Sequence, residues 1–182
     1  MLKNMFLSAA LAALALPAFA VEERHGILVG EVLKLDAATR TVVVKVADGT
    51  RHTLRFAKNT AVHGMKGTAV GAADAFHGLK EGSEVAVHYT AKGTEETARE
   101  VDHIGQDGLN ATEATVTGIG RGGKTLVVKT AKGAEETYRL TGNAARDAGK
   151  DLAKGAKKSG KVTVYYTEEG GHKIAHFFKR AI

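Results

Sequence analysis

The chain has 182 residues, no cysteine and a formal net charge of +6. Without cysteine it has no disulfides, no thiolate metal sites and no cysteine nucleophile, so burial and hydrogen bonding must stabilise the fold. The positive charge is unevenly placed, because residues 26–105 hold as many acidic as basic side chains and residues 111–182 hold twice as many basic ones.

Residues 1–20 have the pattern of a secretory signal peptide. Lys3 precedes an apolar run over residues 6–16, and small residues end at Ala20, which predicts cleavage after Ala20. The apolar run is shorter than the ~20 residues that a spanning helix needs. Val21 would follow the cut, so no cysteine is present there to carry a lipid. We expect an exported protein, periplasmic or secreted, with no membrane span after cleavage.

The first half of the mature chain has the alternation typical of half-buried strands. Apolar and polar residues alternate over residues 41–46 and 53–56. Asp48 and Gly49 lie between them, and an odd loop length is needed to keep both apolar sets on one face. This predicts a three-residue turn with a left-handed glycine. A short helix is then expected near Ala72–Leu79, followed by strands over residues 85–90 and 98–104.

The second half repeats the first. Thr41–Lys45 (TVVVK) recurs as Thr125–Lys129 (TLVVK), and Val85–Thr90 (VAVHYT) recurs as Val162–Thr167 (VTVYYT). Lys132 and Gly133 repeat the turn. A longer helix is predicted here from alanine and leucine at helical spacing (Ala145, Ala148, Leu152 and Ala156), with Asn143 as its N-cap. A last strand is expected over residues 175–181.

Each half thus reads as three strands, a helix and two strands. With the recurring Leu79, Gly82, Val85 and Val87, this order resembles the small OB-fold-like domains found singly or in tandem in exported bacterial proteins, many of unknown function. The resemblance covers both halves and implies a mostly β protein of two tandem OB-fold-like five-stranded barrels, each with one helix between strands three and four. The expected limits are residues 26–105 for domain 1, 106–110 for a linker and 111–182 for the basic domain 2.

A glycine-rich segment, Gly118–Thr125 (GIGRGGKT), satisfies the phosphate-loop and dinucleotide patterns. Both patterns need a helix directly afterwards, because the phosphate lies at the helix N-terminus. Here the following residues, Leu126–Thr130, have the pattern of a strand. The matching stretch of the first half is an ordinary turn, Lys34–Thr41. We therefore interpret the segment as a hairpin loop.

The eight histidines suggest a metal site. His172 and His176 lie in a predicted strand, where residues four apart are ~13 Å apart, too far for one ion. The four other candidates are scattered over separate elements of the first half: His63, His77, His88 and His103. We therefore expect structural histidines, no metal ion and no cofactor.

No catalytic constellation is visible either. Adjacent glutamates occur at Glu95–Glu96, Glu135–Glu136 and Glu168–Glu169, but neighbours on a strand point to opposite faces and do not form an acid and base pair. The serines of the mature chain, Ser83 and Ser159, stand beside glycines with no patterned base nearby. The sequence therefore predicts a protein that is not an enzyme.

Two basic surfaces are candidate binding sites. Lys45 and Arg55 on the second and third strands are matched by Lys129 and Arg139 in domain 2. The domain 2 helix carries a line of basic residues, which we call the basic ridge: Arg146, Lys150, Lys154, and then Lys157 or Lys158. The strand surface suits a polymer, and the basic ridge suits a polyanion or an anionic membrane surface. A plain solvated face is the competing interpretation of both.

Three functions remain open. The leading hypothesis is an exported, non-enzymatic binding or adaptor protein whose two domains dock different partners. The second is a polyanion binder acting through domain 2, with nucleic acid disfavoured because tryptophan is absent and aromatic side chains are few. The third is a metal-dependent enzyme.

Overall fold

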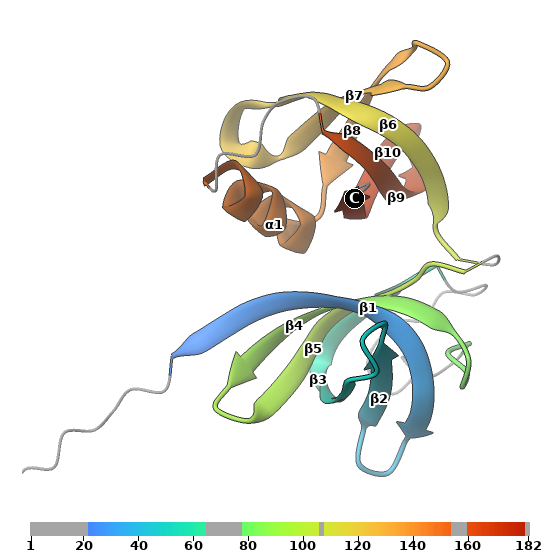
Figure 1. Cartoon of the computed structure of the whole chain (residues 1–182), viewed down its shortest axis with the longest axis vertical. Helices are drawn as coiled ribbons and strands as arrows, with labels where there is room; N and C mark the ends of the chain where they lie inside the picture. Colours follow the sequence, from blue (N-terminus) through green and yellow to red (C-terminus); the bar gives the residue numbers. More distant parts are fainter. Residues whose placement is uncertain (1–21, 65–77, 106–107, 154–159, 181–182) are drawn as a thin grey trace, which may run out of the picture.

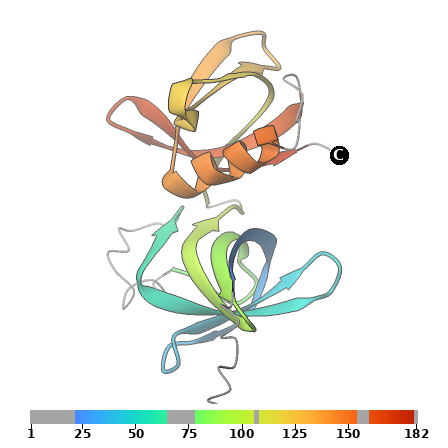
Figure 2. The same ribbon diagram turned by 90° about the vertical axis from the view of Figure 1, so that its left-hand side faces the viewer.

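The computed structural model describes residues 22–64, 78–105, 108–153 and 160–180. These residues form two five-stranded sheets, and each sheet closes on itself as a barrel. The barrels are stacked along the long axis of the molecule (Figure 1). The α-helix α1 lies on the side of the second barrel that faces the first (Figures 1 and 2). The prediction of a mostly β protein is confirmed.

The first barrel has the ring order β1-β2-β3-β5-β4. β3 and β5 run parallel, and the other neighbours are antiparallel. The strands are β1 (Glu23–Asp36), β2 (Thr41–Val46), β3 (Arg51–His63), β4 (Glu84–Lys92) and β5 (Glu95–His103).

The second barrel has the equivalent ring order, β6-β7-β8-β10-β9, again with one parallel pair, β8 with β10. Its elements are β6 (Asn110–Ile119), the short 3₁₀ helix η1 (Arg121–Gly123), β7 (Thr125–Thr130), β8 (Glu135–Leu140), α1 (Gly142–Ala153), β9 (Lys161–Glu169) and β10 (His172–Arg180). The segments paired by sequence similarity, residues 41–45 and 125–129, are therefore second strands in both barrels.

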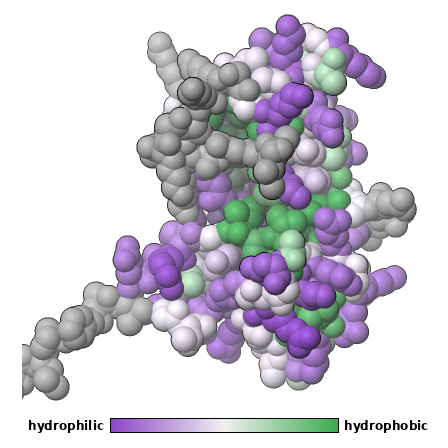
Figure 3. All heavy atoms as spheres, viewed as in Figure 1, coloured by the Kyte–Doolittle hydropathy of each residue, from purple (hydrophilic) through white to green (hydrophobic). Residues whose placement is uncertain are grey.

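Each barrel encloses its own apolar core, built from the alternating residues of the predicted strands. In the first barrel Val42, Val44, Leu54 and Phe56 are fully buried. The second core includes Leu126, Val128, Tyr138, Val162 and Val164. Figure 3 shows apolar side chains where the two barrels meet, between surfaces that are mainly hydrophilic.

The hairpin turns follow the prediction. Gly49 has φ +88° and donates its N–H to the Val46 carbonyl, and Val46 N–H bonds to Thr50 across a three-residue loop. Gly133 repeats this geometry with φ +83°. Only glycine adopts these angles without strain. A three-residue loop therefore fixes the register of both hairpins, as expected.

The glycine-rich segment is a hairpin loop. It joins antiparallel β6 and β7 through η1, and β7 begins at Thr125, where a nucleotide site would need a helix. The nucleotide interpretation is therefore rejected on the geometry of the loop.

The N-cap prediction for the helix is wrong. The Thr141 hydroxyl accepts the Ala144 N–H at 3.2 Å and caps α1, whereas Asn143 lies inside the first turn. The side chain of Asn143 is used elsewhere, as described below. The helix predicted near Ala72–Leu79 lies largely outside the described residues.

Among the described residues, no helix is both long enough and apolar enough to cross a bilayer. Residues 1–20 lie outside the described part, so the signal peptide stays a prediction. The same holds for the domain limits, although β1 begins at Glu23 and β6 at Asn110, slightly before the predicted starts at 26 and 111.

Candidate metal centre between the barrels

Strand β5 carries two acidic side chains into the protein interior. Glu100 and Asp102 are two residues apart on a strand, so both carboxylates point to the same side. Glu100 is 3% exposed and Asp102 is 0% exposed. Two carboxylates buried side by side destabilise a fold unless cations or hydrogen bonds compensate them.

His63 brings an imidazole to these carboxylates from the neighbouring strand. It is the last residue of β3 and the register partner of Asp102 in the parallel β3–β5 pair. Its Nε2 lies 3.6 Å from Glu100 Oε1. The side chain is 31% exposed, so His63 forms the solvent-facing side of the cluster.

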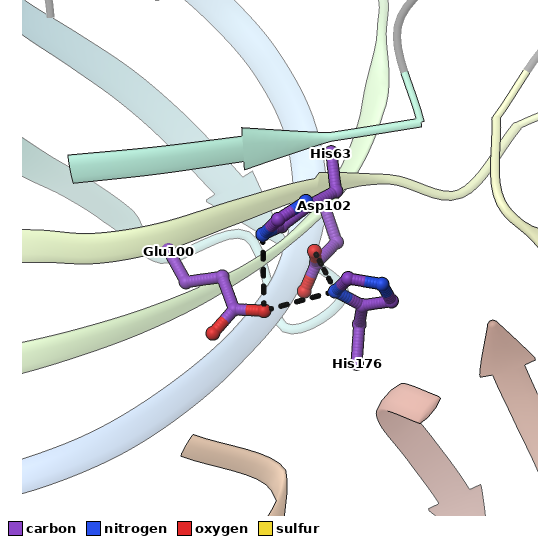
Figure 4. Close-up of side chains that lie close together, drawn as sticks. All are labelled: His63, Glu100, Asp102 and His176. Atoms are coloured by element: carbon purple, nitrogen blue, oxygen red, sulfur yellow. Dashed lines mark hydrogen bonds and ion pairs between the residues drawn. The ribbon is translucent and has the colours of Figure 1, made fainter. Parts of the chain in front are cut away.

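His176 reaches the same carboxylates from the second barrel. Ala175 pairs with Tyr166 and Phe177 with Tyr165, so His176 is the extra residue of a β-bulge in β10. Bulges redirect a side chain that regular pairing would place elsewhere. His176 is 2% exposed, and Figure 4 shows its ring approaching from below while His63 approaches from above.

The four side chains form a compact cluster, which we call the junction cluster: His63, Glu100, Asp102 and His176. One ligand atom from each lies within 4.8 Å of all the others. His176 Nδ1 is 3.2 Å from Glu100 Oε1 and 3.7 Å from Asp102 Oδ1. A tetrahedral ion with bonds of ~2.0–2.1 Å separates its ligands by ~3.3 Å. Because the ligand atoms lie up to 4.8 Å apart, the widest pair would have to close by up to about 1.5 Å to bind such an ion.

The electrostatics of the cluster disfavour a second negative charge beside Glu100. Burial, together with the nearby charge of Glu100, raises the pKa of Asp102 well above its ordinary value. Burial also acts to raise the pKa of Glu100, but hydrogen bonds from His176 and Asn143 outweigh it and bring that pKa below its ordinary value. Burial, and then the neighbouring His176, lowers the pKa of His63. Neutral His63 is the form that binds a metal.

Asp102 is the member of the cluster whose burial is least compensated by hydrogen bonds. Neither of its carboxylate oxygens has a hydrogen-bond partner among the described residues. A buried polar group without a partner costs about 1–3 kcal/mol, and more when charged. A dication between the carboxylates would remove this cost and allow both to ionise.

Two outer side chains orient the ligands. Asn143 Nδ2 of α1 donates to Glu100 Oε2 at 2.6 Å, which turns Oε1 toward the histidines. The Thr167 hydroxyl lies 2.9 Å from His176 Nε2. With Nε2 engaged by Thr167, Nδ1 is the nitrogen that faces the carboxylates. Such outer contacts are characteristic of metal-ligating histidines and carboxylates.

His88 ties the two barrels together beside the cluster. Its Nε2 donates to the His176 carbonyl at 3.1 Å, and its Nδ1 lies 3.0 Å from Asp147 Oδ2 on α1. The ring is 4% exposed. The position of His176 is therefore fixed by its backbone as well as by its ring.

The basic residues singled out in the sequence do not meet at one site. Lys129 and Arg139 are exposed on β7 and β8. Lys129 lies opposite Glu135 in the strand register, and Arg139 Nη2 contacts His172 Nε2 at 3.1 Å. In the first barrel Lys45 is exposed, and Arg55 pairs with Glu95 at 3.6 Å.

The basic ridge lies only partly within the described structure. Arg146 is exposed on α1. Lys150 lies on the same helix, and its side chain is not described. The remaining members lie outside the described residues: Lys154, Lys157 and Lys158.

One histidine pair lies as its spacing predicts, and a different pair was not predicted. His172 contacts Arg139, whereas His176 lies at the junction, so these two do not share a site. The rings of His63 and His176 instead lie in contact, tilted by 47° with centroids 4.2 Å apart, although they belong to different barrels. One feature of the sequence could have indicated this site. Glu100 and Asp102 occupy alternate positions of β5, and acidic side chains are rarely buried unless they are paired.

Comparisons with known proteins give little further information. No family model and no curated protein sequence matches this chain. The solved structures that resemble part of it include two of CusF. Ag(I)-bound CusF is 11% identical with a TM-score of 0.33, covering 44% of this chain and 99% of its own. Apo-CusF residues 6–88 from Escherichia coli is 12% identical with a TM-score of 0.34, covering 51% and 99%. At such TM-scores neither match supports an inference about this chain.

Proposed function

We propose that this protein is an exported, non-enzymatic binding protein that holds one divalent transition-metal ion between its two barrels. The observation that supports this is the junction cluster, in which two imidazoles converge on two buried carboxylates. The sequence led us to expect no metal ion, because these residues belong to elements that its pattern does not relate to one another.

The ligand chemistry selects the class of ion. Two imidazoles with two carboxylates suit Zn²⁺, Cu²⁺, Ni²⁺ or Co²⁺, whereas Mg²⁺ and Ca²⁺ prefer oxygen alone. Soft Cu(I) prefers sulfur ligands, which the cluster lacks. Two carboxylates also balance the charge of a dication, so the buried centre is neutral when loaded. Among these ions, Cu²⁺ should bind most tightly.

The arrangement favours binding over catalysis. Catalytic zinc sites keep a coordination position open for water or substrate, whereas a set of four protein ligands closes the coordination sphere. Three of the four ligands here are at most 3% exposed. The half-exposed ring of His63 gives the ion its path in from solvent.

A titration of the metal-free full-length chain with Zn²⁺ and Cu²⁺ by isothermal calorimetry tests the proposal. We expect one ion per chain, and His63→Ala or His176→Ala should weaken binding at least ten-fold. His172→Ala is the matched control, since His172 lies on the same strand as His176 but outside the cluster.

Co²⁺ provides a spectroscopic test of the geometry. A four-coordinate site with nitrogen and oxygen ligands should give intense visible absorption that His176→Ala abolishes. If the cluster is only a polar contact between barrels, neither tight stoichiometric binding nor a Co²⁺ band will appear, and the proposed function is then wrong.

A further inference from the structure

A second polar feature lies at the barrel junction, a cavity with a volume of about 350 Å³. This is within the range of small-molecule sites, ~300–1,000 Å³. Residues of both barrels line it, including Arg99, Arg146, Asn59, Asn143, Thr90 and Glu23. None of the four residues of the junction cluster lines the cavity, so it is a distinct site, although its lining residue Asn143 also donates to Glu100.

Arg99 is directed to the cavity by an irregularity of its strand. His88 pairs with Glu100 and Tyr89 with Ala98, so Arg99 is the extra residue of a β-bulge. Its Nε donates to Thr90 Oγ1 at 3.2 Å. Its Nη2 contacts the exposed carboxylate of Glu23 at 3.5 Å, which is long for an ion pair.

Arg146 faces the same cavity from α1. Its Nη1 lies 3.2 Å from His25 Nδ1, and the guanidinium is the donor because arginine stays protonated. A guanidinium carries five N–H groups, and the contacts described here use one or two on each arginine. Both side chains are therefore held in place with donors remaining for a ligand.

We propose that this cavity binds a small oxyanion, a phosphate or a carboxylate. Two arginines against a single acidic side chain, Glu23, give the lining a positive balance, and the amide groups of Asn59 and Asn143 add neutral donors. Planar guanidinium groups match the oxygen pairs of carboxylates and phosphates. An entering anion replaces Glu23 as the partner of Arg99, because the 3.5 Å contact is exposed and weak.

This site differs from the basic ridge predicted on the helix of domain 2. Arg146 was assigned there to an extended surface for polymers, whereas the structure sets it opposite Arg99 of the other barrel. A space of about 350 Å³ suits one small anion rather than a chain of them.

Calorimetric titration of inorganic phosphate, and separately of succinate, into full-length protein freed of metal on a chelating resin tests the proposal. We expect saturable binding that Arg99→Gln and Arg146→Gln each weaken at least ten-fold. Glu23→Gln should tighten binding, because it removes the competing carboxylate. Lys34→Gln is the control, since it removes one exposed positive charge of the first barrel away from the cavity.

Binding of either probe with this pattern supports the proposal, and the tighter probe identifies the class of anion. His63→Ala should leave phosphate binding unchanged, which separates this site from the metal centre. No saturable binding of either probe would overturn the proposal. Equal weakening by Arg99→Gln, Arg146→Gln and Lys34→Gln, the three variants that remove a positive charge, would also overturn it, because that pattern indicates diffuse attraction.

Discussion

His176 of the second barrel places its Nδ1 3.2 Å from Oε1 of Glu100 in the first barrel. The two residues are 76 positions apart and are both nearly fully buried. A metal ion bound at this contact would therefore link the two barrels as well as occupy a site.

Metal binding should stabilise the whole chain. A ligand that binds only the folded state adds about 2.7 kcal/mol at a free concentration 100 times its Kd. We expect excess Zn²⁺ to raise the urea midpoint of the wild-type protein and of His172→Ala, but not of His176→Ala. An equal rise in His176→Ala would indicate binding elsewhere.

Asp102→Asn should stabilise the metal-free protein while weakening metal binding. The amide removes a buried carboxylate that has no hydrogen-bond partner among the described residues but is a poorer metal ligand. Opposite effects on unfolding free energy and on Zn²⁺ affinity are expected, measured by urea denaturation and calorimetry. A loss of both would show that the carboxylate stabilises the apo fold.

The raised pKa of Asp102 predicts that the unfolding free energy depends on pH. Because the pKa of Asp102 is raised in the folded state, the folded protein binds more protons than the unfolded chain above pH ~4. The stabilising contribution of protonated Asp102 is therefore present at low pH. It is lost as the pH rises through the folded pKa of Asp102, by at most about 1.4 kcal/mol per pH unit. The unfolding free energy of wild type relative to Asp102→Asn should fall over this interval. A constant difference would contradict the raised pKa.

Thr167→Val tests whether the outer contact positions His176. Valine preserves the shape but removes the hydroxyl that engages His176 Nε2. Loss of such contacts weakens metal sites about 10–100-fold, and Thr167→Ser should restore the affinity. Thr163→Val, two alternations away on the same strand, is the control. Equal effects of the two valine variants would indicate a general disturbance of β9.

Tyr138 should resist ionisation in alkaline solution. Burial, and then the hydrogen bond to Glu136, raises the pKa of Tyr138 to about 12. The unfolded chain loses this proton near pH 10, so the contribution of Tyr138 to stability is lost as pH rises from ~10 toward 12. Absorbance near 295 nm should show a late phase that Tyr138→Phe removes. Complete ionisation of all tyrosines by pH 11 without unfolding would refute the expectation.

Much of the fold could be predicted because its signals are local. Alternating valines in residues 41–46 indicated a half-buried strand, and Gly49 and Gly133 indicated three-residue hairpins. The strand that follows Gly118–Thr125 was enough to reject a nucleotide loop. Each of these inferences depends on neighbours within a few residues, where backbone sterics and period-2 burial govern the outcome.

The junction cluster was decided only by the tertiary structure. His63 and His176 stand in strands of different barrels, and no periodic pattern relates them. A β-bulge directs His176, the packing of α1 brings Asn143 to Glu100, and the stacking of the barrels brings both to β5. Local periodicity places a side chain on one face of its own strand. Which distant side chains meet there depends on how whole barrels pack, because burial and docking involve the entire chain.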